Sequence, residues 1–256
     1  MRLESRTLRI ILAAALCAAA LSPGFAEAQL PPALDAALEQ EPRDRPPDRL
    51  DFRMVIGGEG LTVRVDLTEE PPRYTLLEPD EEALSEDQRG LWNDFLDPES
   101  DAFRGENGLL APLDLRAVVG ETARLKHEEG TLLVYSFDPA AMPGGGMDDG
   151  MDAMTEHLQG EIVIDGESGR PDWLRLFAAE SFKPNFAIRI HAFDVRQTFV
   201  HEPALEGPRL ARSDMVFEVS AAFRRARESL TMEFSNLVFD TADPQPAHLG
   251  EAAESP

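Results

Sequence analysis

A period-two alternation of apolar and polar residues in the C-terminal half constrains the fold of this chain more than any other feature. In the clearest stretch, Met215, Phe217 and Val219 alternate with polar residues such as Glu218, the pattern of a strand with one buried and one solvated face. Similar stretches, separated by short turns, recur over residues 158–239. Because sequential strands joined by short turns pair antiparallel, the sequence predicts an antiparallel meander.

The same pattern extends over most of the chain. Predicted strands of the meander cover 161–165, 173–179, 186–195, 196–201, 213–223 and 229–239, and earlier strands cover 50–56, 61–67, 74–77, 123–128 and 131–137. Helices are predicted over 80–96 and 109–119. A sheet of this size curls rather than staying flat. The expected fold class is therefore mainly β with minor α: a curled antiparallel meander, an incomplete barrel, with helices covering the concave face.

The N-terminus has the pattern of a secretion signal. Three arginines among the first nine residues precede an apolar stretch at 10–21 and a small-residue site ending at Ala28. This pattern predicts a signal peptide over 1–28, cleavage near Ala28, and a periplasmic or secreted mature protein. The single cysteine, Cys17, lies inside the signal, so we expect no disulfide, thiol nucleophile or cysteine metal site in the mature protein.

The net charge of the chain excludes some classes of binding partner. Without residues 1–28 the chain carries 21 basic and 46 acidic groups, a formal charge of −25. Proteins bind nucleic acids and anionic lipid surfaces mainly through their own cationic groups. The acidic composition of this chain therefore excludes nucleic acid as a partner. No later segment approaches the ~20 consecutive apolar residues of a membrane span, so we expect that this protein is not an integral membrane protein.

Composition also suggests the domain limits. We expect a disordered or short-helix linker over 29–49, a single half-barrel domain over 50–239, and a disordered tail over 240–256. Within the domain, residues 138–157 are predicted to form a flexible insertion because they are rich in glycine and aspartate. This segment also carries the soft ligands that Cu(I) prefers, namely Met142, Met147, Met151, Met154 and His157. Their spacing matches no known geometry and methionine is a common gap-filler, so no metal site is assigned.

No catalytic motif accompanies the strands. The five histidines lie outside zincin motifs, and the chain lacks the Gly-x-Ser-x-Gly and Ser-x-x-Lys nucleophile motifs and the phosphate-binding glycine loops. We therefore expect neither an enzyme nor a cofactor.

The sequence predicts a short N-terminal helix, an early hairpin and central helices, followed by a meander that contains 160–165 (GEIVID), 168–169 (SG) and 173–176 (WLRL). In this organisation the chain resembles the periplasmic LolA/LolB/RseB-type lipoprotein-binding superfamily. The resemblance spans about residues 50–239 and implies an incompletely closed antiparallel barrel around a helical plug, with a cavity that binds acyl chains. No catalytic residue is implied.

With sequential strand pairing, the apolar positions predicted to line such a cavity are Ile188, Ile190, Met215, Phe217, Val219, Phe223, Leu230, Met232 and Phe234 from strands, and Leu91 and Phe95 from a helix. The leading hypothesis is a protein that binds a lipid-like ligand or a lipoprotein acyl chain in this cavity. Two alternatives stay open: a module without a cavity that binds another envelope protein, and a Met-rich Cu(I)-binding protein.

Overall fold

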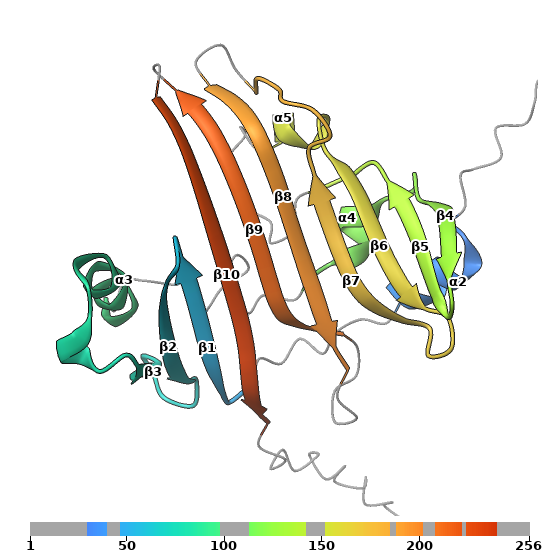
Figure 1. Cartoon of the computed structure of the whole chain (residues 1–256). Coiled ribbons are helices and arrows are strands. Elements are labelled where there is room, and N and C mark those ends of the chain that lie inside the picture. Colours follow the sequence, from blue (N-terminus) through green and yellow to red (C-terminus); the bar gives the residue numbers. More distant parts are fainter. Residues whose placement is uncertain are drawn as a thin grey trace, which may run out of the picture.

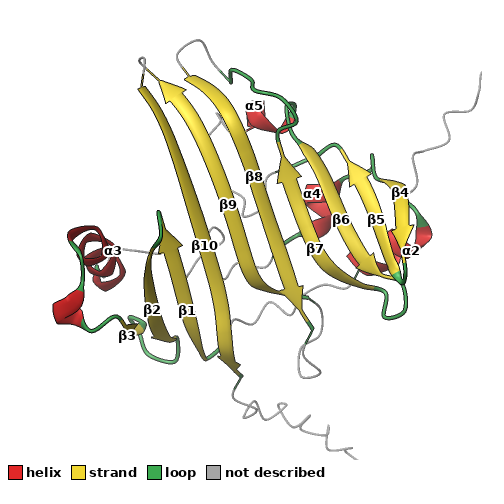
Figure 2. Cartoon of the chain, in the orientation of Figure 1, coloured by secondary structure: helices red, strands yellow, loops and turns green. Residues whose placement is uncertain are grey.

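One antiparallel sheet dominates the computed structural model of the chain, in which the described residues are 30–39, 47–97, 113–141, 152–184, 188–201, 208–221 and 224–239 (Figure 1). Its ten strands are β1 (Arg49–Ile56), β2 (Glu59–Asp66), β3 (Arg73–Glu78), β4 (Arg124–Glu129), β5 (Leu132–Phe137), β6 (Gln159–Asp165), β7 (Arg170–Phe177), β8 (Ile188–Val200), β9 (Arg209–Ala221) and β10 (Arg224–Val238). The described helices are short: α2 (Pro32–Leu38), the 3-10 turn η2 (Glu81–Ala83), α3 (Glu86–Leu96), α4 (Leu115–Val119) and α5 (Asp152–Thr155). Figure 2 shows how far strands outweigh helices. The expected fold class is confirmed.

The strand order is that of a circular meander opened at one place. The order is β3-β2-β1-β10-β9-β8-β7-β6-β5-β4, and every neighbouring pair is antiparallel. Strands that follow each other in the chain are neighbours, apart from the pairing of β1 with β10 and the missing pairing of β3 with β4. The sheet is therefore an incomplete barrel whose edges are β3 and β4.

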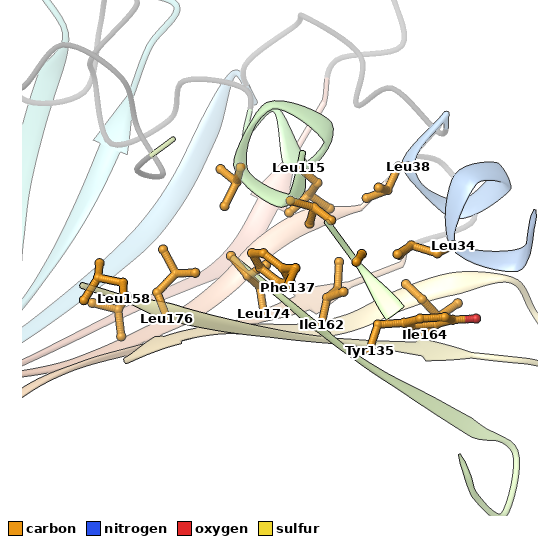
Figure 3. Close-up of a cluster of buried hydrophobic side chains, with 14 of the residues drawn as sticks. Leu34, Leu38, Leu115, Tyr135, Phe137, Leu158, Ile162, Ile164, Leu174 and Leu176 are labelled. Carbon is orange, nitrogen blue, oxygen red and sulfur yellow. The ribbon is translucent and has the colours of Figure 1, made fainter. Parts of the chain in front are cut away.

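Two clusters of buried side chains lie on the concave face of this sheet. The larger one, called here the β4–β8 cluster after the half of the sheet on which it lies, packs side chains of β5–β8, such as Ile162, Leu174 and Ile190, against helices α2, α4 and α5. Figure 3 shows Leu34 and Leu38 of α2 and Leu115 of α4 on the same side of the sheet as the strand residues of this cluster. The smaller one, the β1–β3 cluster, packs strands β1, β2 and the end of β10 against α3. Figure 1 shows α3 beside β2 and β3 at one end of the sheet, and α2 and α4 behind β5–β7 at the other. The helices thus cover the two wings of the sheet.

Two residues, Leu84 and Ser85, separate the 3-10 turn from helix α3, and a capping box fixes the start of this helix. The Ser85 hydroxyl accepts from the backbone N–H of Gln88 at 3.2 Å, and the Gln88 side chain accepts from the backbone N–H of Ser85 at 2.9 Å. Such reciprocal bonds satisfy N–H groups that a helix start leaves free. The predicted single helix over 80–96 is therefore wrong at its N-terminal end, where Leu84 is extended.

Helix α2 corrects the expectation of a linker over 29–49. Its residues Leu34, Ala37 and Leu38 are buried in the β4–β8 cluster, so this helix is part of the core. The expected short helix exists, but its apolar face packs against the sheet, which composition alone did not indicate. Residues 40–46 lie outside the described residues.

Three further predictions need correction. The expected break between strands at 195 and 196 is absent, because β8 runs unbroken from Ile188 to Val200. The helix expected over 109–119 is described only as the single turn α4. The flexible insertion expected over 138–157 does not extend over its last residues, because α5 lies there and Met154 is buried in the β4–β8 cluster. Residues 142–151 and the tail at 240–256 lie outside the described residues.

The convex face is polar. Arg64 donates to the two carboxylate oxygens of Asp51 at 2.8 and 3.0 Å, and Arg175 does the same to Asp194 at 2.9 and 2.6 Å. Such bidentate pairs satisfy charges on neighbouring strands. The sheet therefore has one apolar face and one mainly polar face, as the alternation predicts, although Val134 and Val163 are buried on the second face.

Candidate functional site

The apolar residues in the middle of the concave face are less covered than those on its wings. We call this set the central band: Ile188 of β8, Met215, Phe217 and Val219 of β9, and Leu230 and Met232 of β10. All are partly exposed. The described part of β9 contributes no apolar side chain to the buried core, although it pairs with a strand on each side.

The registers place the band on one continuous surface. Met215 lies opposite Leu230 of β10 and Val195 of β8, and Val219 lies opposite Ile190. Side chains directly opposite on neighbouring strands point to the same face. Met215, Phe217 and Ile188 pack against the β4–β8 cluster, while Leu230 and Met232 pack against the β1–β3 cluster. The band therefore bridges the two clusters.

The other predicted cavity residues are placed differently. Ile190 is only 2% exposed and Phe234 only 7% exposed, so both are core residues beside the band. Leu91 and Phe95 belong with α3 to the β1–β3 cluster, where the Phe95 ring centroid lies 6.1 Å from that of Phe52. The predicted lining is thus divided between the two clusters, because Ile190 belongs to the β4–β8 cluster. Phe223 lies outside the described residues.

The chemistry of the band suits hydrocarbon. Its side chains are aliphatic, thioether and aromatic, and the Phe217 ring lies edge-on to Phe193 with centroids 6.4 Å apart. At the β9–β10 hairpin the same face becomes polar, since Glu228 lies opposite Phe217 and Arg224 opposite Ala221. These two charged residues are exposed. The band is thus an apolar strip with a charged margin at one end.

A buried polar pair beside the band was missed by sequence reasoning. Gln197 of β8 lies opposite Ser213 of β9, and these residues are 9% and 2% exposed. The Oε1 atom of Gln197 is buried and has no hydrogen-bond partner. The signal was present, because Gln197 interrupts the inward series Val195, Phe199, but the predicted strand break at 195 concealed it.

A Ser–His pair lies on the convex face. His191 Nε2 and Ser220 Oγ are 2.9 Å apart. A catalytic triad needs a carboxylate to orient the histidine; the neighbouring Glu218 instead accepts a hydrogen bond from Arg225, and this bond holds the pKa of Glu218 below its usual value. We therefore assign this pair a structural role, linking β8 to β9.

A separate hollow of about 370 Å³ is lined by residues of β1, β2 and the segment from β3 to α3, including Arg53, Thr62, Glu78 and Gln88. This lining mixes charged and hydrogen-bonding side chains with apolar surface. The hollow lies apart from the central band, on residues of β1 and β2 that do not belong to it.

Of the candidate Cu(I) ligands, Met154 is buried, with 6% of its surface exposed. His157 is exposed, and its ring stacks on Phe182 with centroids 4.5 Å apart. Met142, Met147 and Met151 lie outside the described residues. Within the described ranges, no group of histidine, cysteine and acidic side chains is arranged to hold a metal ion.

None of the helices in the described part of the chain is long and apolar enough to cross a membrane. Comparisons with protein-family models, curated proteins and solved structures found no match.

Proposed function

We propose that this protein is an exported, non-catalytic protein that binds the acyl chain of a lipid or lipoprotein on the central band. The observation that carries the proposal is the partial exposure of Met215, Phe217 and Val219 on a strand with neighbours on both sides. Exposed apolar surface in the middle of a sheet weakens folding, so its presence favours a binding role. The resemblance to the LolA/LolB/RseB-type superfamily supports the same proposal.

The energetics of binding follow from burial. Each ligand methylene that leaves water contributes about 0.8 kcal/mol. The affinity therefore rises steeply with the length of the acyl chain, until the chain is long enough to cover the whole central band. A charged surface would show no such dependence on chain length.

The first alternative is an interaction module. The edges β3 and β4 and the central band are all surfaces that a partner protein can cover. In that case binding depends on the shape of the partner and hardly on the length of a free acyl chain. The Cu(I) alternative is weaker, because Met154 is buried within the β4–β8 cluster.

The test compares substitutions on the two faces of β9. Phe217→Asp places a carboxylate in the central band, whereas Val216→Asp places one on the opposite, solvated face of the same strand. We expect Phe217→Asp to weaken binding of a sixteen-carbon acyl probe by at least about tenfold, because an unpaired charge beside hydrocarbon is costly. Val216→Asp should leave binding within about twofold. Titration of delipidated protein with fluorescent acyl probes of increasing length measures both effects.

Circular dichroism must show that both variants are folded. Ile190→Asp is a positive control for core damage, because Ile190 is buried, and we expect it to unfold the protein. Absence of binding by well-folded parent at every chain length would contradict the proposal and favour the interaction module.

A further inference from the structure

Gln197 is a polar residue in apolar surroundings. On the inner face it lies between Leu174 of β7 and Ser213 of β9, and Val195 and Phe199 precede and follow it along β8. Leu174, Val195 and Phe199 are all buried, and Leu174 is labelled within the β4–β8 cluster in Figure 3. The amide is thus placed where an aliphatic side chain is expected.

The amide oxygen makes this position energetically unusual. Gln197 Oε1 is buried without a hydrogen-bond partner, whereas the large majority of buried side-chain polar atoms in proteins have one. A buried acceptor of this kind destabilises the folded chain, because it has lost its hydration and gained nothing in return. A side chain that weakens the fold in this way calls for a role outside folding.

The pair Gln197–Ser213 is continuous with the central band. Ser213 lies opposite Met232 of β10, and Met215 follows it on the same face of β9. Residues two apart in a strand are separated by about 7 Å. A ligand whose chain covers Met215 and Met232 therefore has its polar end within reach of this pair.

We propose that Gln197, together with the Ser213 hydroxyl, is the polar anchor for the ligand head, and that the head is an uncharged hydrogen-bond donor such as an amide N–H or a hydroxyl. This inference rests on the proposed function. The anchor accepts a hydrogen bond at Gln197 Oε1 while the acyl chain lies on the central band. A carboxylate head is disfavoured, because it brings a charge next to Leu174, Val195 and Phe199.

The test uses two probes that differ in one hydrogen-bond donor. N-Methylhexadecanamide has an amide N–H, and N,N-dimethylhexadecanamide has the same chain and carbonyl without it. We expect the delipidated protein to bind the first about tenfold more tightly, measured by displacement of a fluorescent acyl probe. In Gln197→Met, which keeps the side-chain length without the amide, the preference should fall below about twofold.

The control variant is Val216→Asp, which lies on the opposite face of β9 from the band and should keep the tenfold preference. We also expect Gln197→Met to melt at a higher temperature than the parent, because it removes the unpartnered amide. Equal binding of the two amides by the parent would overturn the anchor and leave the proposed function standing, whereas binding of neither would overturn the proposed function itself. A preference that persists in Gln197→Met, or unfolding of that variant, would also overturn the anchor.

Discussion

Asp51 is a buried carboxylate on the convex face of β1 with two partners. Arg64 donates to both of its oxygens, and Asn236 Nδ2 donates to Oδ2 at 2.8 Å. The hydrogen bond from Arg64 is the main cause that keeps the pKa of Asp51 below its usual value, with Asn236 adding to it against the opposing effect of burial. Because the folded-state pKa is lowered, this carboxylate stabilises the fold above the unfolded-state pKa of about 3.9. The contribution is lost as the pH falls through the lower, folded-state pKa.

We therefore expect Asp51→Asn to lower the free energy of unfolding at pH 7 by about 1–3 kcal/mol. The difference from the parent should shrink as the pH falls below about 4, because the unfolded parent then binds a proton at Asp51 that the folded parent binds only at lower pH. Urea unfolding at several pH values measures it. Asp35→Asn is the matched control, because the Asp35–Arg116 pair has side chains 45% and 46% exposed and such pairs contribute little. A difference that stays constant over the whole pH range would show that the charge of Asp51 is not its cause.

At the residue scale, the sequence predicted to which face of the sheet a side chain points, but not how completely that side chain is buried. The alternation predicted that Met215, Phe217 and Val219 share a face, and the register agrees. It did not separate partly exposed Phe217 from buried Ile190, because cover depends on which helix packs above each strand. That packing involves segments far apart in the sequence, which periodicity does not connect.

Helix α2 shows how a short element depends on tertiary contacts. A helix of seven residues is too short to be stable in water by itself. Leu34 is fully buried, so packing against the β4–β8 cluster holds this helix in place.

We expect Leu34→Ala to lower the free energy of unfolding by about 2–5 kcal/mol, the usual cost of truncating a buried leucine. Ala36→Ser, on the exposed side of the same helix, should change it by less than about 0.5 kcal/mol. Chemical denaturation measures both values. Equal, small effects of the two substitutions would mean that residues 32–38 act as a linker in solution.

Strands were easier to predict than helices in this chain, for a physical reason. Strand positions follow from a local alternation, as in β1 and β2. They follow also from turn residues such as Gly130 and Gly169, whose φ angles of 63° and 68° favour glycine. The helices α2 and α4 are shorter than two turns, so their periodicity is brief. Their existence is decided by the sheet beneath them.

For the whole molecule, a single hydrogen-bonded sheet joins the two clusters. Strands β8, β9 and β10 are paired in sequence, and Leu210 packs against both clusters. The chain has two tryptophans, and they lie on different wings: Trp92 in the β1–β3 cluster, and Trp173 on β7, with the Arg196 guanidinium 4.4 Å from its ring centroid.

We expect the two wings to unfold together, because a continuous sheet couples them. Fluorescence of Trp92→Phe reports the β7 wing, and fluorescence of Trp173→Phe reports the β1–β3 wing. Unfolding of each variant is also followed by far-ultraviolet circular dichroism, which reports the whole sheet. Because the two signals are compared within one variant, a change in stability caused by the substitution shifts both equally. Fluorescence and circular dichroism should give coincident urea midpoints in each variant. Separated midpoints would show that the wings are independent folding units.

The pairing of β1 with β10 has a consequence for biosynthesis. Arg53 of β1 and Glu233 of β10 form an ion pair across 180 residues of sequence. During synthesis, β1 therefore cannot complete its pairing until β10 has left the ribosome. Until then, β1 and β9 both present unpaired backbone groups, which are templates for pairing with other chains. Translation that stops before β10 would leave two open edges in addition to β3 and β4. Protection of the nascent chain from aggregation thus depends on its last described strand.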